Sequence, residues 1–127
     1  MYDVVAIGEL LVDFACRSTD DDGYPVLAAH PGGAPANFLA VLARYGLKTA
    51  LLAKVGNDAF GRLLRRTVER EGIDTAGIVV DDAAFTTLAF VTLDENGERD
   101  FSFARKPGAD MLLRYDELDL SLIDRTR

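Results

Sequence analysis

The sequence has very few residues that bind metals or form disulfides: one cysteine and one histidine in 127 residues. Cys16 has no second cysteine to pair with, which is typical of proteins from a reducing compartment. Because Cys16 lies in an apolar stretch, we expect a small core side chain and not a nucleophile. One histidine and one cysteine also form no pattern of metal ligands. No apolar run approaches the ~18 residues of a membrane span, and the first residues are not a basic leader, so we expect a cytoplasmic protein with no membrane partner.

Basic charge is also scarce, with 14 lysines and arginines against 21 acidic residues and a net charge of -7. Nucleic-acid backbones require a basic face, so we expect no nucleic-acid partner. A basic stripe is interpreted as the solvated face of a helix; its members are Arg62, Arg65, Arg66 and Arg70. The composition, 49% apolar and 28% charged, suits one globular domain.

The first half of the chain alternates between strand and helix patterns. Short apolar runs that end at glycine indicate buried strands, and a 3.6-residue apolar period indicates amphipathic helices. Asp58 suits a helix N-cap, and Gly46 and Gly72 suit helix ends. This alternation predicts an α/β core with a parallel sheet. The expected elements are strands at 4–8, 10–16, 24–30 and 49–54, and helices at 35–45 and 58–72.

The second half is predicted to contain antiparallel strands and a final helix. Residues 94–97 contain an Asn-Gly pair typical of a hairpin turn. Two architectures are therefore interleaved, a layered α/β core and a small β-sheet built from separated segments. Only two or three core strands are present, and the last helix has no following strand, so we expect the core sheet to be incomplete. The expected elements are strands at 77–80, 86–93 and 99–103, and a helix at 116–123.

A pair of glycines precedes the first predicted helix and is the first candidate site. Gly32 and Gly33 allow close approach of a ligand to the backbone, and the helix N-terminus offers free N–H groups. Asn37, in the first turn, can present an amide to hydroxyl groups, and His30 adjoins the glycines. A tight turn without a ligand explains the same residues. The segment is neither a Walker A loop nor a dinucleotide-binding glycine motif.

Two charged residues are further candidates. Asp13 interrupts an apolar stretch, where an unpaired carboxylate is costly to bury, so we expect backbone or ligand hydroxyl partners, or else exposure on an edge strand. Arg105 ends a strand pattern before a Pro-Gly turn and could meet a phosphate or an anionic substrate. A surface arginine is the commoner explanation of such a residue.

Four segments in this order resemble the ribokinase-like (PfkB) carbohydrate kinases, and the Gly-Gly-Ala-Pro-Ala-Asn motif resembles their bacterial fructokinase branch. The resemblance extends over nearly the whole chain. It departs from the fructokinase pattern at Ala104 and Lys106, where an aromatic residue and an asparagine are common. The segments are residues 5–13, 31–37, 54–61 and 101–110.

The resemblance implies a ribokinase-like α/β core, left incomplete in residues 1–127, with a β-sheet lid over the sugar. The lid strands would come from about 11–30 and 77–104. Family members often dimerise through these strands, which implies a possible homodimer. The resemblance also implies a small-molecule sugar as ligand. The implied substrate-binding residues are Asp13, Gly32, Gly33, Asn37 and Arg105.

The same resemblance implies that catalysis needs residues that this chain lacks. The family's catalytic base is an aspartate in a Gly-Ala-Gly-Asp-type motif toward the C-terminus, where the ATP pocket also lies, and no such motif is present. We therefore expect ATP and Mg²⁺ to be used by the full-length enzyme and to have no dedicated residues here. We expect no catalytic residue in this chain and no activity of the chain alone.

Three functions are compatible with the sequence. The first is the sugar-binding portion of an ATP-dependent fructokinase, which converts fructose and ATP to fructose 6-phosphate and ADP. The second is a 2-keto-3-deoxygluconate kinase or another PfkB sugar kinase, with Arg105 on a substrate carboxylate. The third belongs to a different class, a non-catalytic sugar-binding or lid-mediated interaction module.

Overall fold

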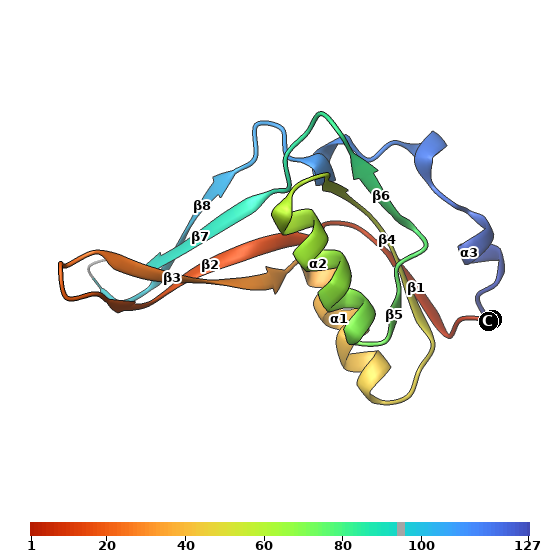
Figure 1. Cartoon of the computed structure of the whole chain (residues 1–127). Coiled ribbons are helices and arrows are strands. Elements are labelled where there is room, and N and C mark those ends of the chain that lie inside the picture. The colour runs from red at the N-terminus through yellow and green to blue at the C-terminus, as the bar shows by residue number, and fades with distance from the viewer. Residues whose placement is uncertain (94–95) are drawn as a thin grey trace.

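The computed structural model describes residues 1–93 and 96–127 and contains two four-stranded sheets (Figure 1). In the core sheet, β4 is buried along its whole length and pairs in parallel with β1 on one edge and with β5 and β6 on the other. The continuous apolar run of β4 favours this central place. The parallel α/β core predicted from the sequence is confirmed. The core strands are β1 (Val4–Ile7), β4 (Thr49–Gly56), β5 (Ile73–Asp74) and β6 (Ile78–Asp81).

Helices α1 (Ala34–Arg44) and α2 (Ala59–Arg70) cover one face of β4. Leu39 of α1 and Leu64 of α2 are fully buried in one apolar cluster with Leu51 and Val55 of β4. Asp58 caps α2 as expected, since its carboxylate accepts the N–H groups of residues 60 and 61. Both helices are therefore held by the apolar stripe that the sequence shows.

Residues 109–124 pack on the opposite face of β4. They form two 3₁₀ turns, η1 (Ala109–Leu112) and η2 (Tyr115–Glu117), and the short helix α3 (Ser121–Asp124). The prediction of a helix at 116–123 is wrong. Leu118 has an extended backbone, and Asp119 accepts bonds from the N–H and hydroxyl of Ser121, which restarts the helix there.

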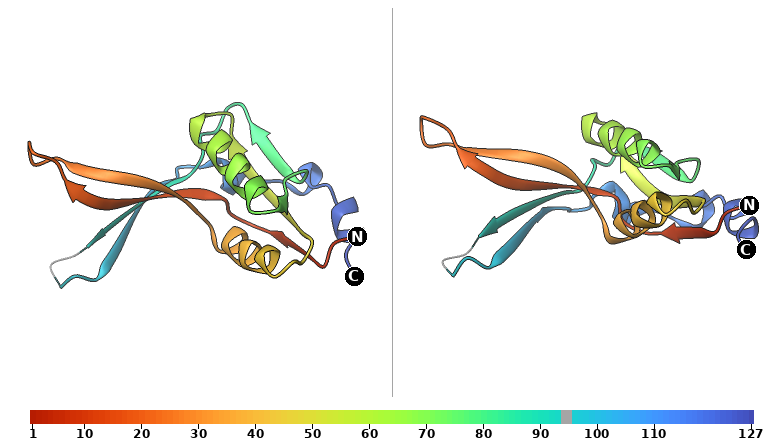
Figure 2. Two further views of the ribbon diagram at one scale, coloured as in Figure 1. Left: turned by 60° about the horizontal axis from the view of Figure 1, so that its bottom comes forward. Right: turned by 90° about the horizontal axis from the view of Figure 1, so that it is seen from below.

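The second sheet has the strand order β3-β2-β7-β8 and projects away from the core as two long hairpin-like arms (Figure 2). We call it the lid sheet. Strands β2 and β7 run parallel, whereas β2–β3 and β7–β8 are antiparallel. The predicted turn at 94–97 lies partly outside the described residues. The lid strands are β2 (Leu11–Thr19), β3 (Pro25–Gly32), β7 (Leu88–Leu93) and β8 (Arg99–Ala104).

Two expectations about the second half need correction. Residues 77–80 were assigned to the lid, but β6 pairs with β4 in the core, because Ile78 packs in the apolar cluster. Cys16 was expected in the core, but it is exposed on β2. The Cys16 side chain stays exposed because this part of the lid sheet extends beyond the core.

Core and lid are joined by a buried polar link. The Asp58 carboxylate accepts bonds from both the N–H and the hydroxyl of Thr86, just before β7. The Thr86 hydroxyl is also the acceptor for the N–H of Gly56 at the end of β4. The link therefore fixes the point where the chain enters the lid.

The two ends of the chain lie together at the far side of the core from the lid (Figure 2). Tyr2 forms a parallel bridge with Thr126, so residues 125–127 lie beside the free edge of β1. In the described part of the chain, no helix is long and apolar enough to cross a membrane.

Candidate functional site

The turn between β3 and α1 brings backbone segments unusually close together. Gly33 is buried, has a φ of 110° and stands directly before α1. A Cβ at this position would lie less than 3.0 Å from the backbone oxygen of Glu9. Glycine is therefore required here by the approach of the β1–β2 connection, and the turn and residue 9 form one unit.

Asp13 lies on β2 beside this turn. It is opposite His30 in the β2–β3 ladder, and its carboxylate packs against Gly32, where a Cβ would overlap it. Burial raises the pKa of Asp13, the negative charge of Glu9 raises it further, and His30 partly offsets both. Within residues 1–93 and 96–127 no hydrogen-bond donor reaches the Asp13 carboxylate. It is thus a half-buried acceptor available to ligand hydroxyls.

Arg105 reaches the same turn from the end of β8. Its Nη2 donates to Glu9 Oε2 at 3.1 Å and also to Asp110, whose side chain is only 1% exposed. Asp110 accepts a second bond from the hydroxyl of Thr87. The hydrogen bond that Arg105 donates to Asp110 is the main cause that raises the pKa of Arg105. These contacts connect the lid ends at residues 87 and 105 to the β1–β2 connection.

The structure places four of the five predicted site residues together and leaves Asn37 apart. Asp13, Gly32 and Gly33 are adjacent, and Arg105 joins them through Glu9. Asn37 donates its backbone N–H to Gly33 but is exposed, and it lines a separate small cavity of about 40 Å³.

A larger concavity extends from Asp13 along one face of the lid. It has a volume of about 540 Å³, and Asp13, His30, Arg17 and Arg99 contribute its polar walls. Carboxylate acceptors and guanidinium donors side by side can hold a ligand rich in hydroxyl groups. Among the residues that the structure describes, no three His, Cys, Asp or Glu side chains are arranged to hold a metal ion.

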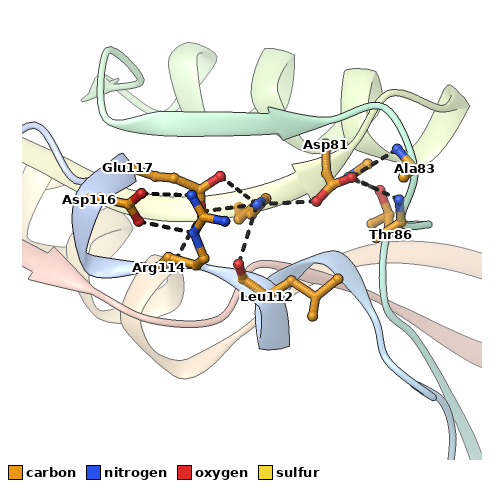
Figure 3. Close-up of polar contacts among 10 residues, drawn as sticks. Asp81, Ala83, Thr86, Leu112, Arg114, Asp116 and Glu117 are labelled. Atoms are coloured by element: carbon orange, nitrogen blue, oxygen red, sulfur yellow. Dashed lines mark hydrogen bonds and ion pairs between the residues drawn. The ribbon is translucent and has the colours of Figure 1, made fainter.

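A second polar network anchors the segment that carries Asp110. The Lys54 side chain is 6% exposed, and its ammonium group contacts Asp81, Leu112 and Glu117. Figure 3 shows how these three partners lie around one point beside β4. The Nζ of Lys54 lies 2.7 Å from Glu117 and 3.1 Å from Asp81. The hydrogen bond that Lys54 donates to Glu117 is the main cause that raises the pKa of Lys54. Strand β4 is thereby tied to both 3₁₀ turns.

Sequence reasoning assigned no role to Glu9, Thr87 or Asp110. Glu9 and Asp110 lie inside two of the four segments that carry the family resemblance, four and five residues from the assigned Asp13 and Arg105. Spacing alone could not show that Glu9 and Asp110 share one guanidinium, because they are about a hundred residues apart in sequence.

The fold and the site define an α/β domain with a half-buried carboxylate, a Gly-Gly turn and a guanidinium at the base of a β-sheet lid. The model of the pfkB family carbohydrate kinases matches residues 1–125, and the chain belongs to this family. It is 45% identical over 124 residues to fructokinase-1 of Zea mays and 46% identical over 125 residues to a probable fructokinase-2 of Arabidopsis thaliana. These matches cover 96% and 94% of this chain but only 38% and 37% of the relatives.

Solved structures agree. A fructokinase of Xylella fastidiosa superposes with a TM-score of 0.91 at 35% identity, over 97% of this chain and 38% of that protein. The same Xylella enzyme has been solved with bound ATP, with a TM-score of 0.88. A ribokinase II candidate from E. coli, in complex with ATP and Mg²⁺, has a TM-score of 0.86 at 31% identity, over 98% of this chain and 40% of that one. The expected ribokinase-like fold is confirmed, and the chain spans two-fifths or less of these relatives' length.

Proposed function

We propose that this chain is the sugar-binding portion of an ATP-dependent fructokinase. The complete enzyme would move the γ-phosphate of ATP to the 6-hydroxyl of fructose. The observation that carries the proposal is Asp13, a half-buried carboxylate without a donor from the described residues, beside a Gly-Gly turn in a chain 45% identical to a fructokinase. A carboxylate in this setting is stabilised by hydroxyl donors, and a sugar supplies them.

Each predicted residue has a role in the proposed complex. Asp13 accepts bonds from sugar hydroxyls, and Gly32 and Gly33 allow the sugar to approach the backbone. Arg105 donates to sugar oxygens from its free nitrogens. Asn37 completes the site from the first turn of α1, where its exposed side chain is free to turn toward a ligand.

We assign ATP and Mg²⁺ to the complete kinase, and no residue of this chain to either of them. Support comes from the relatives solved with these ligands. ATP supplies the phosphoryl group and Mg²⁺ neutralises its developing charge. The contribution of this chain is to orient the sugar hydroxyl and exclude water. The chain alone should release no ADP in the presence of fructose and ATP.

The proposal includes a second copy of the chain as a partner through the lid. The lid face opposite Asp13 has an apolar concavity of about 430 Å³ lined by Phe14, Cys16, Leu27 and Phe90. Leu27 is 42% exposed. Apolar surface of this kind supports association with another apolar face. We place the protein in the cytoplasm, in line with its single cysteine.

Two other functions remain to be separated from the fructokinase. An acid-sugar kinase is supported by Arg105 at the site, and a non-catalytic sugar-binding module by a site that lies wholly within this chain. A chimera in which this chain replaces the matching region of the Xylella fastidiosa fructokinase provides the test. ADP release would be measured with fructose, ribose and 2-keto-3-deoxygluconate.

We expect fructose to give the highest kcat/KM in the chimera. Turnover of the acid sugar alone would replace fructokinase with an acid-sugar kinase. Fructose binding without any ADP release from a folded chimera would support the module.

A further inference from the structure

The positive charge of Arg105 is outweighed by the negative charges of the carboxylates near it. Its Nη2 contacts the carboxylates of Glu9 and Asp110 together, and Glu9 also acts on Asp13 by like-charge repulsion. The group thus contains three carboxylates and one guanidinium. His30 offsets only part of the rise in the pKa of Asp13, which burial and Glu9 cause. Beside Asp13 a ligand meets a negatively charged surrounding, whereas Arg17 and Arg99 line the same concavity further along the lid.

Asp110 is fixed more firmly than an ordinary surface partner. Its side chain is 1% exposed, and it accepts bonds from both Thr87 and Arg105. The turn that carries it is tied to β4 through the contact of Lys54 with Leu112. The Asp110 carboxylate is thus held in place against the guanidinium of Arg105.

Arg105 nevertheless keeps a hydrogen-bond donor free. Its Nε is buried and has no partner among the described residues. A buried donor without an acceptor is unfavourable, and a neutral ligand oxygen would satisfy it. Arg105 is therefore equipped to donate a hydrogen bond without offering a net positive charge.

We infer that Glu9 and Asp110 make this site selective for uncharged sugars and against sugar acids, by neutralising Arg105. The inference rests on the proposed function and specifies the substrate class of the same site. Asp110 is a positioning residue, since it acts through Arg105. Glu9 adds negative charge from the β1–β2 connection. Without these carboxylates, the same guanidinium would attract an anionic ligand.

The test is a titration of the 127-residue chain, followed by the shifts of its backbone amide NMR signals. The probes are D-fructose and D-gluconate, a sugar acid of similar size. The variants are Glu9→Gln and Asp110→Asn, which remove one negative charge each with little change of shape. Glu69→Gln is the matched control, because Glu69 is exposed on α2 and loses the same charge away from the site.

The unmodified chain should bind fructose at least about tenfold more tightly than gluconate, the effect of one unit charge over a partly screened distance. Each site variant should reduce this preference about tenfold, and the control should leave it unchanged. If Asp110→Asn fails to fold, Glu9→Gln decides the outcome, because the Glu9 side chain is 35% exposed.

The outcomes separate the two proposals. Fructose binding with a preference that neither variant changes would overturn the charge selectivity and leave the sugar-binding function standing. A folded chain that binds no fructose, a chain without a dispersed spectrum, or tighter binding of gluconate than of fructose would overturn both.

Discussion

Replacement of Gly33 by alanine tests the backbone contact under the candidate site. Gly33 has a φ of 110°, and an added Cβ would lie less than 3.0 Å from the Glu9 backbone oxygen. The matched control is Gly46→Ala, at a φ of 85° with no atom within 4 Å of an added Cβ. Positive φ costs both variants roughly 1–2 kcal/mol. Overpacking against fixed backbone adds about 1–3 kcal/mol in Gly33→Ala alone.

The expected losses in the free energy of unfolding are therefore about 2–5 kcal/mol for Gly33→Ala and about 1–2 kcal/mol for Gly46→Ala. Urea denaturation at neutral pH measures both, with equal slopes if the unfolded states are alike. Equal losses in the two variants would refute the close contact between the turn and residue 9. Because the turn positions Gly32 against Asp13, Gly33→Ala should also weaken the binding of fructose.

Three further predictions concern charged groups. Lys54→Met leaves Asp81 and Glu117 without their shared cation and should lower the Tm by roughly 5–10 °C. The control Lys48→Met, at an exposed lysine, should change the Tm by under about 2 °C. Equal Tm shifts in the two variants would contradict a stabilising network around Lys54. The pKa of Asp81 is lowered to about 2, first by backbone N–H groups and then by Lys54. The pKa of Glu117 is lowered mainly by Lys54. The contribution of both carboxylates to the stability of the fold is therefore present above about pH 4 and is lost as the pH falls toward about 2. Urea midpoints between pH 5 and pH 2 should show this loss, with a shallower slope in Lys54→Met; parallel slopes would argue against it. Sugar hydroxyls stabilise the ionised form of Asp13, so saturating fructose should lower its raised pKa in a ¹³C carboxyl titration, and an unchanged pKa would exclude direct contact.

Much of the fold could be predicted from local patterns. Strand β4 is mostly apolar and is buried throughout, and the 3.6-residue period of α2 places Leu64 and Val68 inside. The N-cap at Asp58 follows from its chemistry at the helix start. These features depend on residues close in sequence, so one sequence is enough to show them.

Other elements depend on contacts between distant segments. Strand β6 has the composition of any short strand, and only its pairing with β4 decides that it belongs to the core. Strand β5 has two residues, too few for a pattern. The final helix was predicted too long, because the Asp119 side chain competes for the helix start.

In the candidate site, too, some residues could be predicted from local patterns and others depend on contacts between distant segments. Asp13 and the two glycines were recognised, since a charge in an apolar stretch and a Gly-Gly pair before a helix are visible locally. The neutralisation of Arg105 was not, because its partners come from residues 9 and 110. Lys54 ended a predicted apolar strand, and its burial depends on carboxylates that lie 27 and 63 residues further along the chain.

The most direct test of the proposed function is the rate of fructose-dependent ADP formation by the Xylella chimera with and without Asp13→Asn. Hydrogen bonds to a charged group contribute about 1.5–3 kcal/mol each. Asparagine keeps one acceptor oxygen but loses the other and the charge, so kcat/KM for fructose should fall about a hundredfold. Asp119→Asn, in the segment that packs on the far face of β4, is the control and should change kcat/KM less than about twofold. Our account predicts a large loss in the Asp13 variant alone. A chimera that phosphorylates fructose equally well with aspartate or asparagine at position 13 would contradict it.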